Sequence, residues 1–143
     1  MMMTCKLKNQ TEETARLQPF IRTCIDRFEL PADWEMRINL AIEEAVVNVM
    51  QYAFDDREEH EICLEAERKE DVFTLTVSDG GRAFNPLEAP EADTTLNAEE
   101  REIGGLGIHL IRSLADEVTY RRESGRNVLS LHFVCKEMPH PKD

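Results

Sequence analysis

Residues Ile42 to Phe54 read IEEAVVNVMQYAF, and this stretch has the spacing of a core helix with polar groups along one edge. With Ile38 set at zero and about 100° added per residue, the apolar side chains cover roughly 300° to 80° of the helix. They are Ile38, Ala41, Ile42, Ala45, Val46, Val49, Tyr52 and Ala53. Glu44 falls at about 240° and Asn48 at about 280°, beside that apolar stripe. A helix built only for stability would place Ala or Leu at both positions.

Two interpretations of this polar pair are open from the helix alone. Glu44 could be an exposed carboxylate while Asn48 hydrogen-bonds nearby backbone. In the functional interpretation, the amide oxygen is a hard ligand for magnesium and the carboxylate is a general base, as a phosphoryl-transfer site requires.

Length and composition predict one globular domain over residues 1–143. Hydrophobic residues make up 41% and charged residues 32%, and the apolar runs are too short to span a bilayer. No apolar segment follows Met1, so a cytoplasmic protein without a signal peptide is expected. The scattered cysteines favour small apolar groups in a reducing compartment over a zinc site. A net charge of −12 argues against nonspecific nucleic-acid binding and suits selected protein partners.

Periodicity along the chain predicts a strand, two helices, a hairpin, a long loop, a helix and a last hairpin. The expected fold is an α+β two-layer sandwich, with a mixed, largely antiparallel sheet covered on one face by about three helices. Thr11 and Asp33 are expected to cap the first two helices. The expected segments are Thr4 to Asn9, Thr14 to Phe28, Trp34 to Phe54, Ile62 to Ala66, Phe73 to Val77, the loop Phe84 to Glu102, Gly104 to Ala115, Val118 to Arg121 and Val128 to Val134, with a frayed tail over 137–143.

Two further motifs add chemistry to this outline. VSDGGRAFNP, from Val77 to Pro86, ends a strand with Asp79, and Gly81 lets backbone approach a flat ligand. GGLGIHLIRSLAD, from Gly104 to Asp116, opens a helix with glycines, whose free N–H groups and positive dipole end suit phosphates. Each motif alone is more typical of an ordinary turn or helix start.

Taken together, the three motifs closely resemble the N, G1 and G2 boxes of the GHKL ATPases, which have the Bergerat, or histidine-kinase-like, ATP-binding fold. Within that superfamily the short chain is similar to the anti-sigma-factor serine kinases of the RsbW and SpoIIAB type. The resemblance implies that Glu44 is the general base and that Asn48 ligates Mg²⁺ on the ATP phosphates. It further implies that Asp79 accepts from the adenine amine, while Gly81 and Ala83 shape the base pocket. The phosphates would meet Gly104, Gly105, Leu106, Gly107 and Ile108, and residues from about 85 to 104 would form the ATP lid.

Two positions depart from the family pattern. Gln51 stands where many relatives have histidine, and Ala83 stands where glycine is usual. Ala83 adds one methyl group near the ligand, so we expect it to change affinity more than to abolish binding.

The resemblance implies a partner-switching serine/threonine kinase that phosphorylates a STAS-domain anti-anti-sigma protein and sequesters a sigma factor or similar target. The alternative is an ATP-binding regulatory module that binds partners without phosphorylating them. A histidine kinase fragment is disfavoured, because about forty residues precede the first motif, too few for a phosphoacceptor hairpin. A homodimer is allowed by the resemblance. Arg16 and Arg22 on the first helix mark either a partner surface or a solvated face.

Overall fold

One five-stranded sheet forms the frame of the computed structural model, which describes residues 1–54, 56, 58–88 and 106–135. The strand order is β1-β2-β3-β5-β4, and every pairing among the described residues is antiparallel. The predicted α+β sandwich is therefore confirmed. The sheet, expected to be mixed and largely antiparallel, is antiparallel throughout the described residues. The strands are β1 (Met2–Lys8), β2 (Glu61–Lys69), β3 (Val72–Asp79), β4 (Glu117–Glu123) and β5 (Arg126–Val134).

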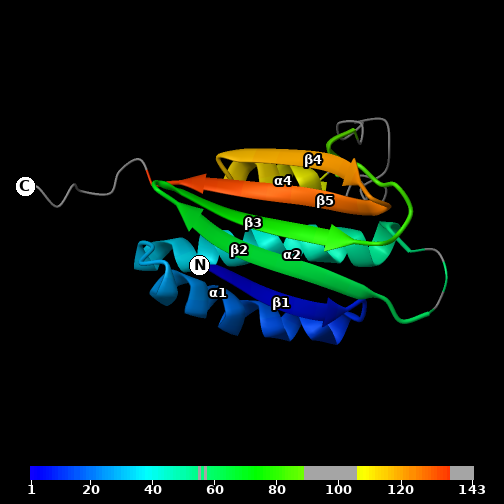
Figure 1. Ribbon diagram of the computed structural model, residues 1–143, viewed down its shortest axis with the longest axis horizontal. Coiled ribbons are helices and arrows are strands. Elements are labelled where there is room, and N and C mark those ends of the chain that lie inside the picture. Colours follow the sequence, from blue (N-terminus) through cyan, green and yellow to red (C-terminus); the bar gives the residue numbers. More distant parts are fainter. Residues whose placement is uncertain (55, 57, 89–105, 136–143) are drawn as a thin grey trace, which may run out of the picture.

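Three α-helices among the described residues lie on the same side of this sheet (Figure 1). They are α1 (Leu17–Arg27), α2 (Glu35–Tyr52) and α4 (Leu106–Leu114). Figure 1 shows α2 between α1 and α4, with α4 behind β4 and β5. Short 3₁₀ helices occupy Thr11–Arg16, Ala32–Trp34 and Pro86–Glu88.

The capping predictions at Thr11 and Asp33 are wrong. The residues that precede α1 and α2 are Arg16 and Trp34, and neither makes a side-chain cap. The chain instead enters each helix through a 3₁₀ turn, in which backbone N–H groups bond three residues back. Trp34 N, for example, donates to Pro31 O at 3.0 Å. The turn supplies acceptors that a capping side chain would otherwise provide.

The core lies between the helices and the helix-facing rows of the strands. Alternate strand residues point to opposite faces, so each strand sends one row inward. The inward rows include Ile62, Leu64 and Ala66 of β2, Phe73, Leu75 and Val77 of β3, and Leu129, Leu131 and Phe133 of β5, all at most 5% exposed. From α2, the predicted apolar stripe is buried at Ile38, Ala41, Ile42, Ala45, Val46 and Val49. This burial fixes which side of α2 faces the sheet.

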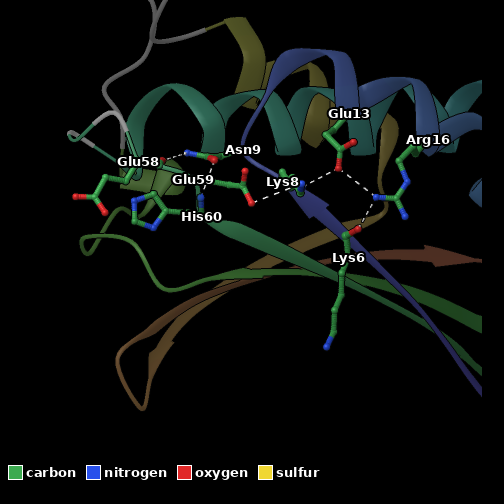
Figure 2. Close-up of polar contacts among 8 residues, drawn as sticks. All are labelled: Lys6, Lys8, Asn9, Glu13, Arg16, Glu58, Glu59 and His60. Carbon is green, nitrogen blue, oxygen red and sulfur yellow. Dashed lines mark hydrogen bonds and ion pairs between the residues drawn. The ribbon is translucent and has the colours of Figure 1, made fainter.

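The junction between β1 and the following 3₁₀ helix is held by the carboxylate of Glu13, as Figure 2 shows. Its Oε1 accepts from Lys8 N at 2.9 Å and from the Arg16 guanidinium at 3.1 Å. Arg16 also donates to Lys6 O at 2.7 Å, which ties the 3₁₀ helix back to the strand. These contacts hold the pKa of Glu13 below its usual value, the Lys8 amide being the largest cause.

The last hairpin turns where the sequence predicts it, at Ser124 and Gly125, with φ values of 52° and 76°. Only the first residues of the expected ATP lid, through Glu88, belong to the described part of the chain, and the expected tail over 137–143 lies outside it. In the described residues, no helix is long and apolar enough to cross a membrane.

Candidate nucleotide-binding site

Glu44 and Asn48 lie on the side of α2 that faces α4. Arg37 identifies this side, because its Nε donates to Leu114 O at the end of α4 at 2.7 Å. Its guanidinium also lies 3.1 Å from Asp116 Oδ2. Glu44 follows Arg37 by about two helical turns and Asn48 by about three, so all three share one side of the helix. The predicted placement of the polar pair at the edge of the buried stripe therefore matches the packing.

Both side chains of the pair are half-buried, and neither makes a hydrogen bond or ion pair with another described residue. Polar groups that lose part of their water without gaining a protein partner carry a cost in free energy. That cost is understandable if the carboxylate and the amide are kept available for a ligand.

Asp79 ends β3 in the row of the strand that faces the helices. The row continues from Phe73, Leu75 and Val77, and Asp79 is only 1% exposed. Its Oδ1 accepts from Gly81 N at 2.8 Å and from Asn127 Nδ2 at 3.0 Å. Among the described residues no hydrogen bond reaches Oδ2. A buried carboxylate with one oxygen fully used and the other available is a suitable acceptor for a ligand.

The turn after β3 packs against the C-terminal end of α2. Arg82 N donates to Ala53 O at 2.9 Å, and Arg82 Nε donates to Tyr52 O at 2.8 Å. A Cβ on Gly81 would lie against Ala53 O and only 2.9 Å from the Ala53 carbonyl carbon. Glycine is thus required for this close approach. The contact brings Asp79 and Gly81 to the end of α2 that carries Asn48.

Ala83 and Phe84 continue this turn toward β5. Ala83 is exposed. Phe84 N donates to Asn127 Oδ1 at 3.0 Å, and the Phe84 ring lies 5.5 Å from that of Tyr52. Burial raises the pKa of the Tyr52 phenol.

The glycine-rich motif is described only from its third residue onward. Gly104 and Gly105 lie outside the described residues, while Leu106, Gly107 and Ile108 form the first turn of α4. N–H groups in a first turn have no acceptor within their own helix, so they are available to an anion. The side chain of Ile108 is 8% exposed and belongs to the core.

Asn127 is a residue of this region that the sequence analysis missed. It is 4% exposed, and β3 and β5 pair so that it stands opposite Asp79. A signal was present, because Asn127 occupies the apolar row of β5, two residues before Leu129. A polar residue in that row requires partners, but only the register of the sheet shows that Asp79 is one of them.

Side chains from the described part of the chain do not by themselves complete a metal site. The described residues contain no group of three or more His, Cys, Asp or Glu side chains arranged to hold one. Magnesium, however, commonly takes one or two protein oxygens and completes its shell with phosphates and water. The amide of Asn48, which has no hydrogen-bond partner among the described residues, fits that mode.

The sequence is similar to a known domain family and to curated proteins. Residues 7–133 match the family described as histidine kinase-like ATPase domain. The chain is 33% identical over 101 residues to the serine-protein kinase RsbW of Listeria monocytogenes serovar 1/2a. The match covers 68% of this chain and 64% of that protein. It is also 33% identical over 104 residues to RsbW of a Staphylococcus aureus strain, covering 68% and 65% of the two chains. The match spans just under two thirds of the length of these relatives.

Solved structures show the same fold at low sequence identity. The RsbU and RsbW domains of a Mycobacterium tuberculosis protein superpose with a TM-score of 0.66 at 13% identity, over 94% of this chain and 32% of that one. A chain in the structure of the SiaB-SiaC complex from Pseudomonas aeruginosa superposes with a TM-score of 0.55 at 13% identity. This match covers 92% of the present chain and 89% of that one.

Proposed function

Because this chain belongs to the histidine kinase-like ATPase domain family, we propose that it binds ATP beside α2 and transfers the γ-phosphoryl group to a serine or threonine of a partner protein. The observation that carries the proposal is the half-buried pair of Glu44 and Asn48 facing α4, neither of which has a hydrogen-bond or ion-pair partner among the described residues. The similarity to RsbW kinases supports the reaction class. A site that only bound nucleotide would have no use for an unpaired carboxylate at Glu44.

In the proposed step, Glu44 accepts the proton of the attacking hydroxyl. The hydroxyl oxygen forms a bond to the γ-phosphorus as the bond to the bridging oxygen breaks, and that electron pair leaves with ADP. Asn48 would hold magnesium, which when bound neutralises charge on the phosphates. Asp79 would accept from the adenine amine, with Gly81 and Ala83 bordering the base. The first turn of α4, with Gly104 and Gly105 before it, would donate N–H groups to the phosphates.

The proposed partners are a STAS-domain protein as phosphoacceptor and a sigma factor or similar target, a choice supported by the similarity to RsbW. Phosphorylation adds a charge of about −1.5 to −2 to the acceptor. Since this protein carries a net charge of −12, the added charge would favour release. Calorimetry with the modified and unmodified acceptor tests this switch, and equal affinities would contradict it.

The kinase proposal is tested by incubating the protein with magnesium, labelled ATP and the STAS proteins of its own genome. Glu44→Gln is expected to lower the rate of transfer about 10²- to 10⁴-fold while ATP affinity changes little, because only the proton acceptor is lost. Asn48→Asp is expected to alter nucleotide and magnesium binding as well as rate.

Glu43→Gln is the matched control, since Glu43 is the exposed neighbour of Glu44 on the same helix. It removes the same charge and should leave the transfer rate unchanged. Transfer that persists in Glu44→Gln would reject Glu44 as the base. Tight ATP binding by the wild type without transfer to any STAS protein would favour the regulatory module that binds without phosphorylating.

A further inference from the structure

Asn127 hydrogen-bonds to three segments of the chain at once. Its Nδ2 donates to Asp79 Oδ1 at 3.0 Å and to Arg82 O at 2.8 Å. Its Oδ1 accepts from Phe84 N at 3.0 Å, from the Tyr120 hydroxyl at 2.6 Å and from the Arg122 guanidinium at 3.1 Å. Arg122 also donates to Gly81 O at 2.9 Å. One buried amide thus links the end of β3, the turn that follows it, and β4.

These contacts fix which way the amide of Asn127 faces. Phe84 N, the Tyr120 hydroxyl and the Arg122 guanidinium all act as donors, so the atom that meets them must be the oxygen. The NH₂ group must then face Arg82 O and the carboxylate of Asp79. Asn127 therefore acts as an obligatory donor to Asp79.

The carboxylate of Asp79 is oriented in turn. Two donors, Gly81 N at 2.8 Å and Asn127 Nδ2 at 3.0 Å, converge on Oδ1 from the turn and from the neighbouring strand. Hydrogen bonds to a charged acceptor are stronger than neutral ones, so together they favour one rotation of the carboxylate. Oδ2 is the oxygen left for a ligand.

We propose that Asn127 is a positioning residue that sets the base specificity of the nucleotide site, by saturating Asp79 Oδ1 and leaving Oδ2 to accept from the exocyclic amine of adenine. This inference rests on the proposed ATP binding and deepens it. Without the Asn127 donor, the carboxylate can rotate or take a water at Oδ1, and its hydrogen bond to the amine is no longer favoured by the protein.

The test compares two nucleotides that differ only in that amine, ATP and purine riboside triphosphate. Their dissociation constants are measured with magnesium by calorimetry for the wild type, Asn127→Ser and Asn127→Leu. We expect the wild type to prefer ATP by about tenfold or more, the value of one hydrogen bond to a charged group. In Asn127→Ser the preference should fall to within about threefold of unity. Asn127→Leu keeps a similar side-chain volume and has no donor, so it tests the same loss in a second variant should Asn127→Ser fail to fold.

Tyr120→Phe is the control, because the Tyr120 hydroxyl bonds the oxygen of Asn127 and not Asp79. Its preference for ATP should stay within about twofold of the wild type. A merely structural role of Asn127 would weaken both nucleotides equally and leave their ratio intact, and that result would overturn the inference. A wild type that binds neither nucleotide would overturn the proposed function itself.

Discussion

Gly81 is the residue at which backbone packing leaves the least room for change. The carbonyl of Ala53, at the end of α2, occupies the space that a side chain on Gly81 would need. The same carbonyl accepts the hydrogen bond of Arg82 N. Neither the Ala53 carbonyl nor the backbone of Gly81 can move without separating the turn after β3 from α2.

We predict that Gly81→Ala destabilises the protein by about 1–3 kcal/mol, because the new methyl group meets rigid backbone. Urea unfolding measures this change, and nucleotide affinity should fall with it. Gly80→Ala is the matched control. Its Cβ would have only an ordinary contact, 3.7 Å from the Arg126 side chain, so we expect a change within about 0.5 kcal/mol. Equal effects of the two substitutions would contradict this account.

Single residues also show how far sequence reasoning reaches. Helical periodicity alone put Glu44 and Asn48 at the edge of the buried stripe, since both lie within one helix whose geometry is known. Asn127 could not be found in this way, because its partner Asp79 is 48 residues away. The role proposed for it depends on the pairing of β3 with β5, which no local pattern encodes.

At the scale of elements, the strands and helices were predicted well and their ends less so. The alternation in β2 and β3 and the turn at Ser124 and Gly125 are local signals, and both hairpins are confirmed. The helix starts were predicted wrongly because the 3₁₀ turns before α1 and α2 satisfy the same backbone groups as a cap.

The joint between β1 and the first 3₁₀ helix should be acid-sensitive through Glu13. The Lys8 amide and Arg16 lower the pKa of this carboxyl in the folded protein, so its contribution to stability is present above its ordinary value of 4.5 and is lost as the pH falls through the lower folded value. Glu13→Gln should therefore be less stable than the wild type at neutral pH. The difference should shrink below about pH 4.5 and vanish in stronger acid.

Urea unfolding over a pH series measures this difference. Glu12→Gln is the control, because Glu12 accepts no hydrogen bond from the described residues. Its difference from the wild type should be small. A stability difference for Glu13→Gln that stays constant from neutral to acid pH would rule out the carboxylate contacts as its cause.

For the whole molecule, the formal net charge of −12 is the dominant electrostatic feature. Like charges repel one another within a compact state. Salt weakens this repulsion, and at an ionic strength of about 0.1 M it largely screens charges that are more than about 10 Å apart. We predict that raising sodium chloride from about 0.05 M to about 0.5 M increases the melting temperature. Glu12→Lys, which brings the net charge from −12 to −10, should show a smaller increase. A melting temperature that falls with salt would indicate that ion pairs outweigh the repulsion.

The order of events during folding follows from where β3 and β5 meet. Two of the strand pairs are hairpins that close over short turns, namely β2 with β3 and β4 with β5. The pairing of β3 with β5 instead joins segments that are far apart in the chain. Contacts of high sequence separation form more slowly than local ones, because a longer chain segment must be closed first. Asp79 and Asn127 face each other across this seam between the two hairpins. During refolding, secondary structure should therefore appear before the proposed pocket for the base, and nucleotide affinity is expected to be a late marker of a completely assembled sheet.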